Sequence, residues 1–468
     1  MGLNRGLALL VAGTFFMENL DGTIIATAAP SMAADFGIAS VDIHSAITAY
    51  LVTLAVGIPL SGWLVERLGA RRVFVTAIVV FTVASALCAA STGLAMLTVM
   101  RVLQGVGGAM MVPVGRLVVL RVTAKADLVT AIAYLTWPAL LAPVIAPVLG
   151  GLFATYATWR WIFLVNIPLG VVALVVALRL VPSAAGHDPG PADWRGFVLA
   201  GLGLAAIILG MDRVGYEPVP WVSVVVSVAI GVAALVLAVR HMLGSSRPLL
   251  DFRVLRVVTF RDSTSSGSVF RLVISAVPFL LPLMMQDAFG WSPVRAGGMV
   301  IAVFVGNVGI KPVTTPLMRR FGFRTVLIAS TVGALFSIAS FAVLTPTTPT
   351  AAFAGLLLAS GVFRSVGFTA YNSIQFADID AGEMSAANTL AASTGQLASG
   401  LGVAVGALGL RGAQAGLTIL APGASLTTAY HVSFLILAAI LLVAVYGAVR
   451  MAAGAGAHVS RPVRPVRT

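Results

Sequence analysis

The amino-acid sequence predicts an all-α integral membrane protein with about 14 transmembrane helices. Three observations lead to this fold class. Hydrophobic residues make up 59% of the 468 residues and charged residues only 10%, whereas a soluble domain carries roughly a quarter charged residues. Apolar stretches long enough to cross a bilayer recur along the whole chain. The basic residues between them gather in alternate loops. This composition excludes a water-soluble enzyme and a disordered chain.

The apolar stretches have the length that a bilayer requires. A membrane-crossing helix needs about 20 apolar residues, and segments such as Trp161–Leu178, Pro218–Val239 and Met384–Leu410 contain no charge. In order along the chain, the expected spans are 7–29, 45–65, 73–91, 94–115, 128–154, 161–179, 196–211, 220–239, 264–286, 296–317, 325–344, 351–376, 385–410 and 428–449. The loops are short, so no extramembrane domain is expected. Because the spans continue to the end, the first is not a signal peptide ahead of a soluble domain.

The basic residues predict the orientation of these spans. With the N-terminus inside, 21 of the 29 Lys and Arg residues fall on the cytoplasmic side, and four lie within spans. The exceptions on the outside are Arg160, Arg213, Arg295 and Arg411. Cytoplasmic loops carry an excess of Lys and Arg, so both termini are expected in the cytoplasm of a multi-pass inner or plasma membrane protein. The net charge of +13 therefore reflects topology, and no nucleic-acid partner is expected.

One segment is repeated within the chain. The stretch "GWLVERLGARRVF" (62–74) returns as "TPLMRRFGFRTVL" 253 residues later. The matching pairs are Leu64 and Leu317, Arg67 and Arg320, Gly69 and Gly322, Arg71 and Arg324, and Val73 and Val326. Both copies lie in expected cytoplasmic loops, after the second and the tenth span. Duplicated halves with a site at their interface are the plan of many secondary transporters.

The repeat divides the chain into two pseudo-symmetric bundles. We expect an N-terminal six-helix bundle over 1–180, a linker with two inserted helices over 181–250, and a C-terminal six-helix bundle over 251–450. The residues 451–468, which include "SRPVRPVRT", form a basic cytoplasmic tail. Such a tail is typical of a positively charged flank on the inner side of a membrane.

Four motifs in order resemble signatures of the major facilitator superfamily, in its fourteen-helix drug:proton antiporter branch. They are "LDGTIIATAAP" (20–30), "GWLVERLGARR" (62–72), "LTVMRVLQGVGGA" (97–109) and "WRWIFLVNIPLG" (159–170). The resemblance covers nearly the whole chain. It implies that the second motif brackets a gate between the halves, although the family usually has Asp at the position of Glu66. The residues that match this gating loop are Gly62, Glu66, Arg67, Gly69, Arg71 and Arg72.

A fifth motif departs from the family pattern. The antiporter signature of the fifth helix has Gly where "APVIAPVLGG" has Ala142 and Ala146. The remaining residues of this packing motif are Pro143, Pro147, Gly150 and Gly151. Alanine still permits close helix packing, so the departure leaves the fold unaffected but weakens the inference of antiport. Uptake by proton symport therefore stays open.

Glu18 and Asp21 are the acidic residues that the sequence places deep in the bilayer. They stand three positions apart on the first span and therefore share a face. An ionisable group in a span is costly and usually functional. We expect reversible protonation, with a structural ion pair to a neighbouring helix as the alternative. By resemblance, Asp21 occupies the position of the family's first-helix Asp, whereas Glu18 is additional, and Arg101 pairs with one of the two acids.

The C-terminal half holds embedded bases and no embedded acid. Arg271, Lys311 and Arg364 lie in its expected spans. They form either a basic wall that attracts an anionic substrate or, for Arg271 and Lys311, side chains that snorkel to the membrane surface. With Gln104 and Asn372 they are the candidate residues of the substrate cavity.

No motif for direct coupling to a nucleotide occurs. The chain lacks G-x-x-x-x-G-K-[ST], its five histidines are dispersed, and one cysteine, Cys88, excludes a thiolate metal cluster. We therefore expect no metal and no cofactor, with the proton gradient as the energy source. The expected protein is a monomer in the lipid bilayer that binds protons and a small molecule.

The resemblance implies a proton-coupled secondary transporter that exports drugs or other amphipathic small molecules by alternating access. The alternative substrate is an organic anion or a metal-chelate. A membrane-bound enzyme or receptor is the competing class of protein, and a flux assay in vesicles would distinguish it from a transporter.

Overall fold

The computed structural model describes residues 4–183, 186–215, 218–452 and 454–456, and this part of the chain is helical without a strand. The first eight helices are α1 Arg5–Phe36, α2 His44–Gly57, α3 Ser61–Leu68, α4 Ala70–Ala89, α5 Leu94–Val122, α6 Leu128–Tyr156, α7 Trp161–Leu164 and α8 Asn166–Leu180. Two further helices follow, α9 Trp194–Asp212 and α10 Trp221–Gly244. The last seven are α11 Val258–Leu283, α12 Pro293–Gly309, α13 Lys311–Phe321, α14 Phe323–Ser340, α15 Thr350–Ile374, α16 Met384–Leu420 and α17 Leu426–Arg450.

The predicted fold class is confirmed, but the count of 14 spans is not. Among the described residues, 12 helices are long and apolar enough to cross a membrane, and 13 if the pair α12 and α13, bent by 49°, counts as one span. The 29-residue helix α6 is described in its side chains only in part, with Leu128–Pro138 as an apolar stretch. The outer surface is apolar: α10, for example, exposes Val222 and Val225 by 80% and 62%, as expected of a lipid-facing helix.

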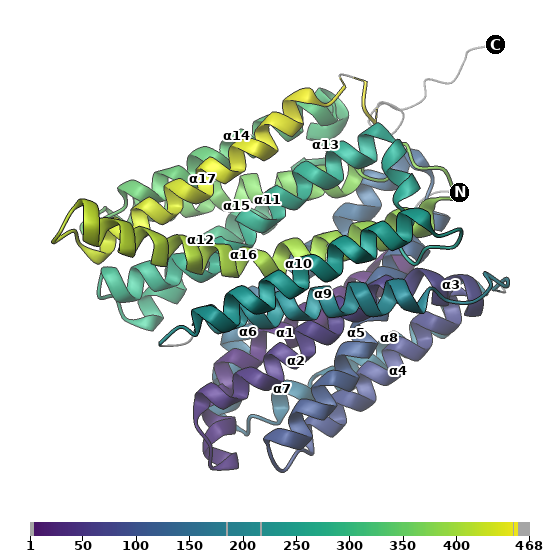
Figure 1. The fold of residues 1–468 in the computed structure, drawn as a ribbon, viewed down its shortest axis with the longest axis horizontal. Helices are drawn as coiled ribbons and strands as arrows, with labels where there is room; N and C mark the ends of the chain where they lie inside the picture. The colour runs from purple at the N-terminus through teal and green to yellow at the C-terminus, as the bar shows by residue number, and fades with distance from the viewer. Residues whose placement is uncertain (1–3, 184–185, 216–217, 453, 457–468) are drawn as a thin grey trace.

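The helices form two lobes. Figure 1 shows α1–α8 on one side of the molecule, α11–α17 on the other, and α9 and α10 between them. The inserted helix α9 packs on α2 of the first lobe and on α16 of the second. Its last residue, Asp212, accepts a hydrogen bond from Thr48 Oγ1 over 3.1 Å. The domain boundaries expected from the sequence stay a prediction.

The repeated loops have the same local structure in both lobes. Gly69 ends α3 and Gly322 ends α13, with φ angles of 85° and 77°, a backbone conformation that favours glycine. Arg71 then donates a hydrogen bond to the carbonyl oxygen of Leu178 near the end of α8. Its counterpart Arg324 donates to the carbonyl oxygen of Val449 near the end of α17, over 2.9 Å. The sequence repeat thus corresponds to a structural repeat.

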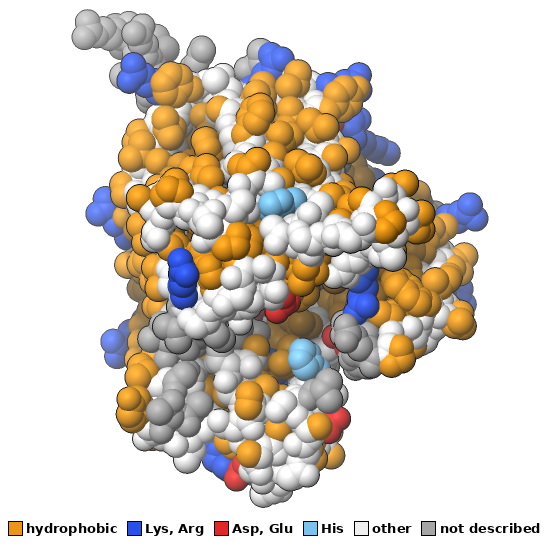
Figure 2. Space-filling view, turned by 90° about the vertical axis from the view of Figure 1, so that its left-hand side faces the viewer, with side chains coloured by type: hydrophobic (Ala, Val, Ile, Leu, Met, Phe, Trp, Pro, Cys, Tyr) orange, Lys and Arg blue, Asp and Glu red, His pale blue; other side chains and the backbone are white. Residues whose placement is uncertain are grey.

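The lobes touch at the end of the molecule that carries the start of α1 and the end of α17. A Cβ atom on Gly62 would lie 2.6 Å from Thr389 Oγ1 of the second lobe, so α3 and α16 approach closely there. Beside this contact, the Asn388 side-chain amide donates to the Pro113 carbonyl oxygen over 2.9 Å. Figure 2 looks onto the opposite end, where the surface is hollowed between the lobes.

Candidate functional site

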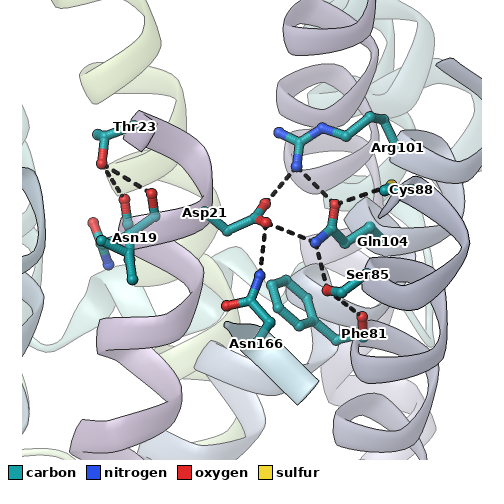
Figure 3. Close-up of polar contacts among 10 residues, drawn as sticks. Asn19, Asp21, Thr23, Phe81, Ser85, Cys88, Arg101, Gln104 and Asn166 are labelled. Atoms are coloured by element: carbon teal, nitrogen blue, oxygen red, sulfur yellow. Dashed lines mark hydrogen bonds and ion pairs between the residues drawn. The ribbon is translucent and has the colours of Figure 1, made fainter. Parts of the chain in front are cut away.

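Asp21 lies in a sealed polar cluster within the first lobe. Its side chain and that of Arg101 are both fully buried and form an ion pair. The amide groups of Gln104 and Asn166 donate to Asp21 Oδ1 over 2.8 and 2.9 Å. Figure 3 shows these side chains converging on the carboxylate from α1, α5 and α8. A buried charge is tolerated when it is paired and hydrogen-bonded in this way.

Small residues on α5 bring the neighbouring helices close enough to seal the cluster. A Cβ atom on Gly107 would lie 2.7 Å from the backbone nitrogen of Phe81 in α4, and one on Gly105 would lie 3.0 Å from the carbonyl oxygen of Tyr50 in α2. The Arg101 guanidinium lies 4.0 Å from the centre of the Tyr50 ring. Close backbone approach therefore packs α2 and α4 against α5 around the cluster.

A second site, a cavity of about 410 Å³, lies between the lobes. Its polar lining includes one carboxylate, Glu18, and three guanidinium groups. Glu18 comes from α1, Arg116 from α5, Arg271 from α11 and Arg364 from α15, so both lobes contribute. Asn19, Thr23, Thr136, Asn372 and Gln396 also line the cavity. Its size and its mix of apolar and polar groups fit a small-molecule site.

The two acids of α1 therefore have different surroundings. Asp21 is 1% exposed and points to α5 and α8, whereas Glu18 faces the cavity. Successive helical residues differ by about 100°, so a step of three turns the side chain by about 60°. The sequence left open which acid Arg101 contacts, and the structure shows that it is Asp21.

Some of the other candidate cavity residues line the cavity, and others do not. Arg271 and Arg364 line the cavity, so they do not snorkel, and Arg271 donates to Asn372 Oδ1 over 3.1 Å. Gln104 does not line it, because its amide is committed to Asp21 and to Ser85. Lys311 sits at the bend between α12 and α13. There its Nζ donates to Thr136 of the first lobe over 3.1 Å and to Thr369 of the second over 2.8 Å.

The gating-loop residues lie outside the cavity, on α3 and the start of α4. Besides Gly62, Gly69 and Arg71, described above, the Glu66 carbonyl oxygen accepts from the His187 amide of the linker over 2.8 Å. Arg67 stacks on Trp63 with 5.2 Å between guanidinium and ring centre. Arg72 is exposed. The linker thus lies directly on the loop.

The packing motif of α6 is described only in part. A Cβ atom on Gly150 would collide with the Thr27 side chain of α1, so this glycine permits a close α1–α6 contact. The surroundings of Pro143, Pro147 and Gly151 lie outside what the structure describes. Within the described part of the chain, no group of three or more His, Cys, Asp or Glu side chains could hold a metal ion.

Two of the residues that complete these sites, Arg116 and Asn166, do not stand out in the sequence. Arg116 stands one position beyond the expected end of the fourth span at 115, so it was assigned to the cytoplasmic flank. The helix in fact continues to Val122, and the length of the apolar pattern beyond Arg116 was the available signal. Asn166, inside the motif "WRWIFLVNIPLG", carried no charge that distinguished it from a packing residue.

Two helical lobes with an apolar exterior and a polar cavity between them define a membrane transporter. The sequence model of the Major Facilitator Superfamily matches residues 11–403. A protein of Escherichia coli O6:H1 (strain CFT073), provisionally named multidrug resistance protein MdtD, is 37% identical over 417 residues, 86% of each chain. Its counterpart in E. coli O45:K1 (strain S88) is 36% identical over the same length and the same share of each chain.

The same fold occurs in a solved structure. The crystal structure of the human organic anion transporter MFSD10 (TETRAN) aligns with a TM-score of 0.65 over 94% of this chain and 100% of that chain, at 14% identity. The chain belongs to the Major Facilitator Superfamily and is a multi-pass membrane transporter.

Proposed function

We propose that the protein is a proton-coupled exporter of drugs or other amphipathic small molecules. The observation that carries this proposal is the pair of embedded acids on α1, one sealed against Arg101 and the other in the cavity between the lobes. The relatives named for multidrug resistance support the type of substrate.

In this proposal, the proton binds at Asp21 with the help of Glu18. Protonation of Asp21 removes the charge that holds Arg101, so α1 and α5 are no longer tied by an ion pair. Since Glu18 stands on the same helix, a shift of α1 also moves the Glu18 carboxyl group relative to a substrate in the cavity. Alternating access then follows from rocking of the two lobes around the cavity. Protonation from the outside favours release of substrate and return to the inward-open state.

The proposal also includes where the protein works and what drives it. It works in the inner membrane as a monomer, with both termini in the cytoplasm, as the distribution of basic residues predicts. The proton gradient is its energy source, and no cofactor takes part.

Transport in proteoliposomes with an imposed pH gradient tests the proposal. A panel of cationic, neutral and anionic aromatic compounds reports substrate and direction, and a pH dye reports proton movement. We expect Asp21→Asn to abolish substrate-driven proton movement and Glu18→Gln to reduce it. Asp42→Asn is the control, because Asp42 lies in the loop before α2. Undiminished proton movement in Asp21→Asn would contradict the assignment of the proton carrier.

A second candidate is export of an organic anion or a metal-chelate. The three guanidinium groups that line the cavity, against a single carboxylate, favour it. The same panel separates the two candidates by the charge of the compound that moves.

A further inference from the structure

The charges of the cavity are unevenly divided between the lobes. The lining of the first lobe holds one acid and one base, Glu18 and Arg116. The lining of the second lobe holds Arg271 and Arg364. Among the described residues, neither of these two forms an ion pair with an acid. The second lobe therefore presents two positive charges that the described part of the protein leaves unbalanced.

The two arginines of the second lobe are arranged around one aromatic ring. The guanidinium of Arg271 lies 5.0 Å and that of Arg364 lies 5.8 Å from the centre of the Phe368 ring. All three residues line the cavity. The Arg364 Nε is buried without a hydrogen-bond partner in the described part of the chain. The described residues therefore leave this donor unsatisfied, while the Arg364 side chain lines the cavity.

The neighbouring residues leave Arg271 accessible. A Cβ atom on Gly395 of α16 would lie 3.4 Å from Arg271 Nε, so the absence of a side chain there makes room for the guanidinium. Asn372 accepts one of its hydrogen bonds. A guanidinium group carries five donors, and this single contact leaves the others for the cavity.

An uncompensated charge in a low-dielectric site is costly unless it is paired. An anionic group supplies the missing pair, and carboxylate, sulfonate or phosphate matches the planar fork of arginine. The Phe368 face adds contact area for an aromatic body next to that group. A cation would instead be repelled by both arginines.

We propose that Arg271, Arg364 and Phe368 form the head-group site for an aromatic organic anion. This inference rests on the proposed function in taking the cavity as the transport site, and it narrows the substrate to one charge class. Glu18, which lines the cavity from the opposite lobe, then faces the body of the substrate.

Binding of two dyes with the same xanthene ring system tests the proposal. Fluorescein is anionic and rhodamine 123 is cationic at pH 7.5. The protein is reconstituted in nanodiscs of phosphatidylcholine, so that the lipid carries no net charge, and binding is followed by fluorescence anisotropy. We expect the wild type to bind fluorescein at least tenfold more tightly than rhodamine 123.

The variants Arg271→Gln and Arg364→Gln should each weaken fluorescein binding by about tenfold or more, as loss of a charge-assisted contact does. Arg271→Lys should retain part of the affinity, because it keeps the charge and loses the fork. The control is Arg295→Gln, since Arg295 stacks on Trp291, at 3.9 Å, and does not line the cavity. It should bind both dyes as the wild type does.

Three results would overturn the proposal: fluorescein fails to bind the wild type, the Gln variants bind it unchanged, or rhodamine 123 binds more tightly. If a Gln variant fails to fold, Arg271→Lys takes its place, and it should still weaken fluorescein binding because it keeps the charge and loses the planar fork. Arginine-dependent binding without proton-coupled flux would refute the proposed function and keep this site. Proton-coupled flux together with dye binding that is unchanged in the arginine variants would support the proposed function and refute this site.

Discussion

The ion pair between Asp21 and Arg101 allows a quantitative test of how the first lobe is held together. Three variants are needed: Asp21→Asn, Arg101→Gln and the double variant. Each single change leaves one charge in a site where both side chains have 0% exposure. Breaking a buried ion pair by removing one partner costs about 3–5 kcal/mol, because the other charge remains buried and unpaired.

The surrounding groups set where in this range each variant falls. In Asp21→Asn, Arg101 keeps its hydrogen bond to Gln104 Oε1, 2.7 Å long, and its contact with the Tyr50 ring. We therefore expect a loss of about 3 kcal/mol, at the low end of the range. In the double variant no charge is buried, and amide groups replace both partners. It should lose less stability than either single variant.

Unfolding in mixed detergent and SDS micelles, followed by tryptophan fluorescence, measures these differences in free energy. The double-mutant cycle should give a coupling of about 3 kcal/mol or more between the two positions, because the double variant should lose less stability than either single variant. The reasoning is refuted if the double variant loses the sum of the two single losses, since additivity would mean that the two charges do not depend on each other.

Two further predictions concern packing and pH. Gly107→Ala should destabilise the protein by about 1–3 kcal/mol, because the new Cβ would lie 2.7 Å from the Phe81 backbone and backbone cannot move aside as a side chain can. The control is Gly355→Ala, whose Cβ would have no neighbour within 4 Å. It should change stability by less than about 1 kcal/mol. Thermal unfolding compares them. At the start of α9, burial raises the pKa of Asp193, but hydrogen bonds from the Gly196 amide and from His241 outweigh it and hold the pKa below its usual value. The carboxylate therefore stabilises this helix end at neutral pH, and the stabilisation is lost as the pH falls through the lowered pKa. Opening of the first turn of α9, measured by amide hydrogen exchange, should increase over that pH range. Asp193→Asn should show no such increase.

The fold was predictable because its signals repeat along the chain. Most spans contain enough apolar residues to be recognised alone, and the repeat of 62–74 marks equivalent positions in the two halves. The ends of helices were less predictable. Arg116 was assigned to a loop because a charge ordinarily ends a span, whereas here the cavity accommodates it inside α5. A sequence shows that a charge is present but not whether a cavity lies beside it.

The sequence predicts which charged residues belong to the candidate site, but it does not predict which residues they pair with. Asp21, Arg101 and Arg271 stood out because charges in spans are rare. Their partners Asn166 and Asn372 are neutral amides, which resemble packing residues in an apolar pattern. Gln104 was visible next to Arg101 but was assigned to the cavity. Its fully buried position depends on the approach of α4, which no local pattern reveals.

The two sites differ in how they depend on the separation of the lobes. Among the described residues, the partners of Asp21 all belong to the first lobe, so rocking of the lobes leaves that cluster intact. The cavity draws Glu18 and Arg271 from different lobes, so rocking changes it directly. A proton on Asp21 can therefore influence transport only by moving a helix that reaches both sites. The helix α1 does so, because Glu18 lies less than one turn from Asp21, and α5 does so through Arg101 and Arg116.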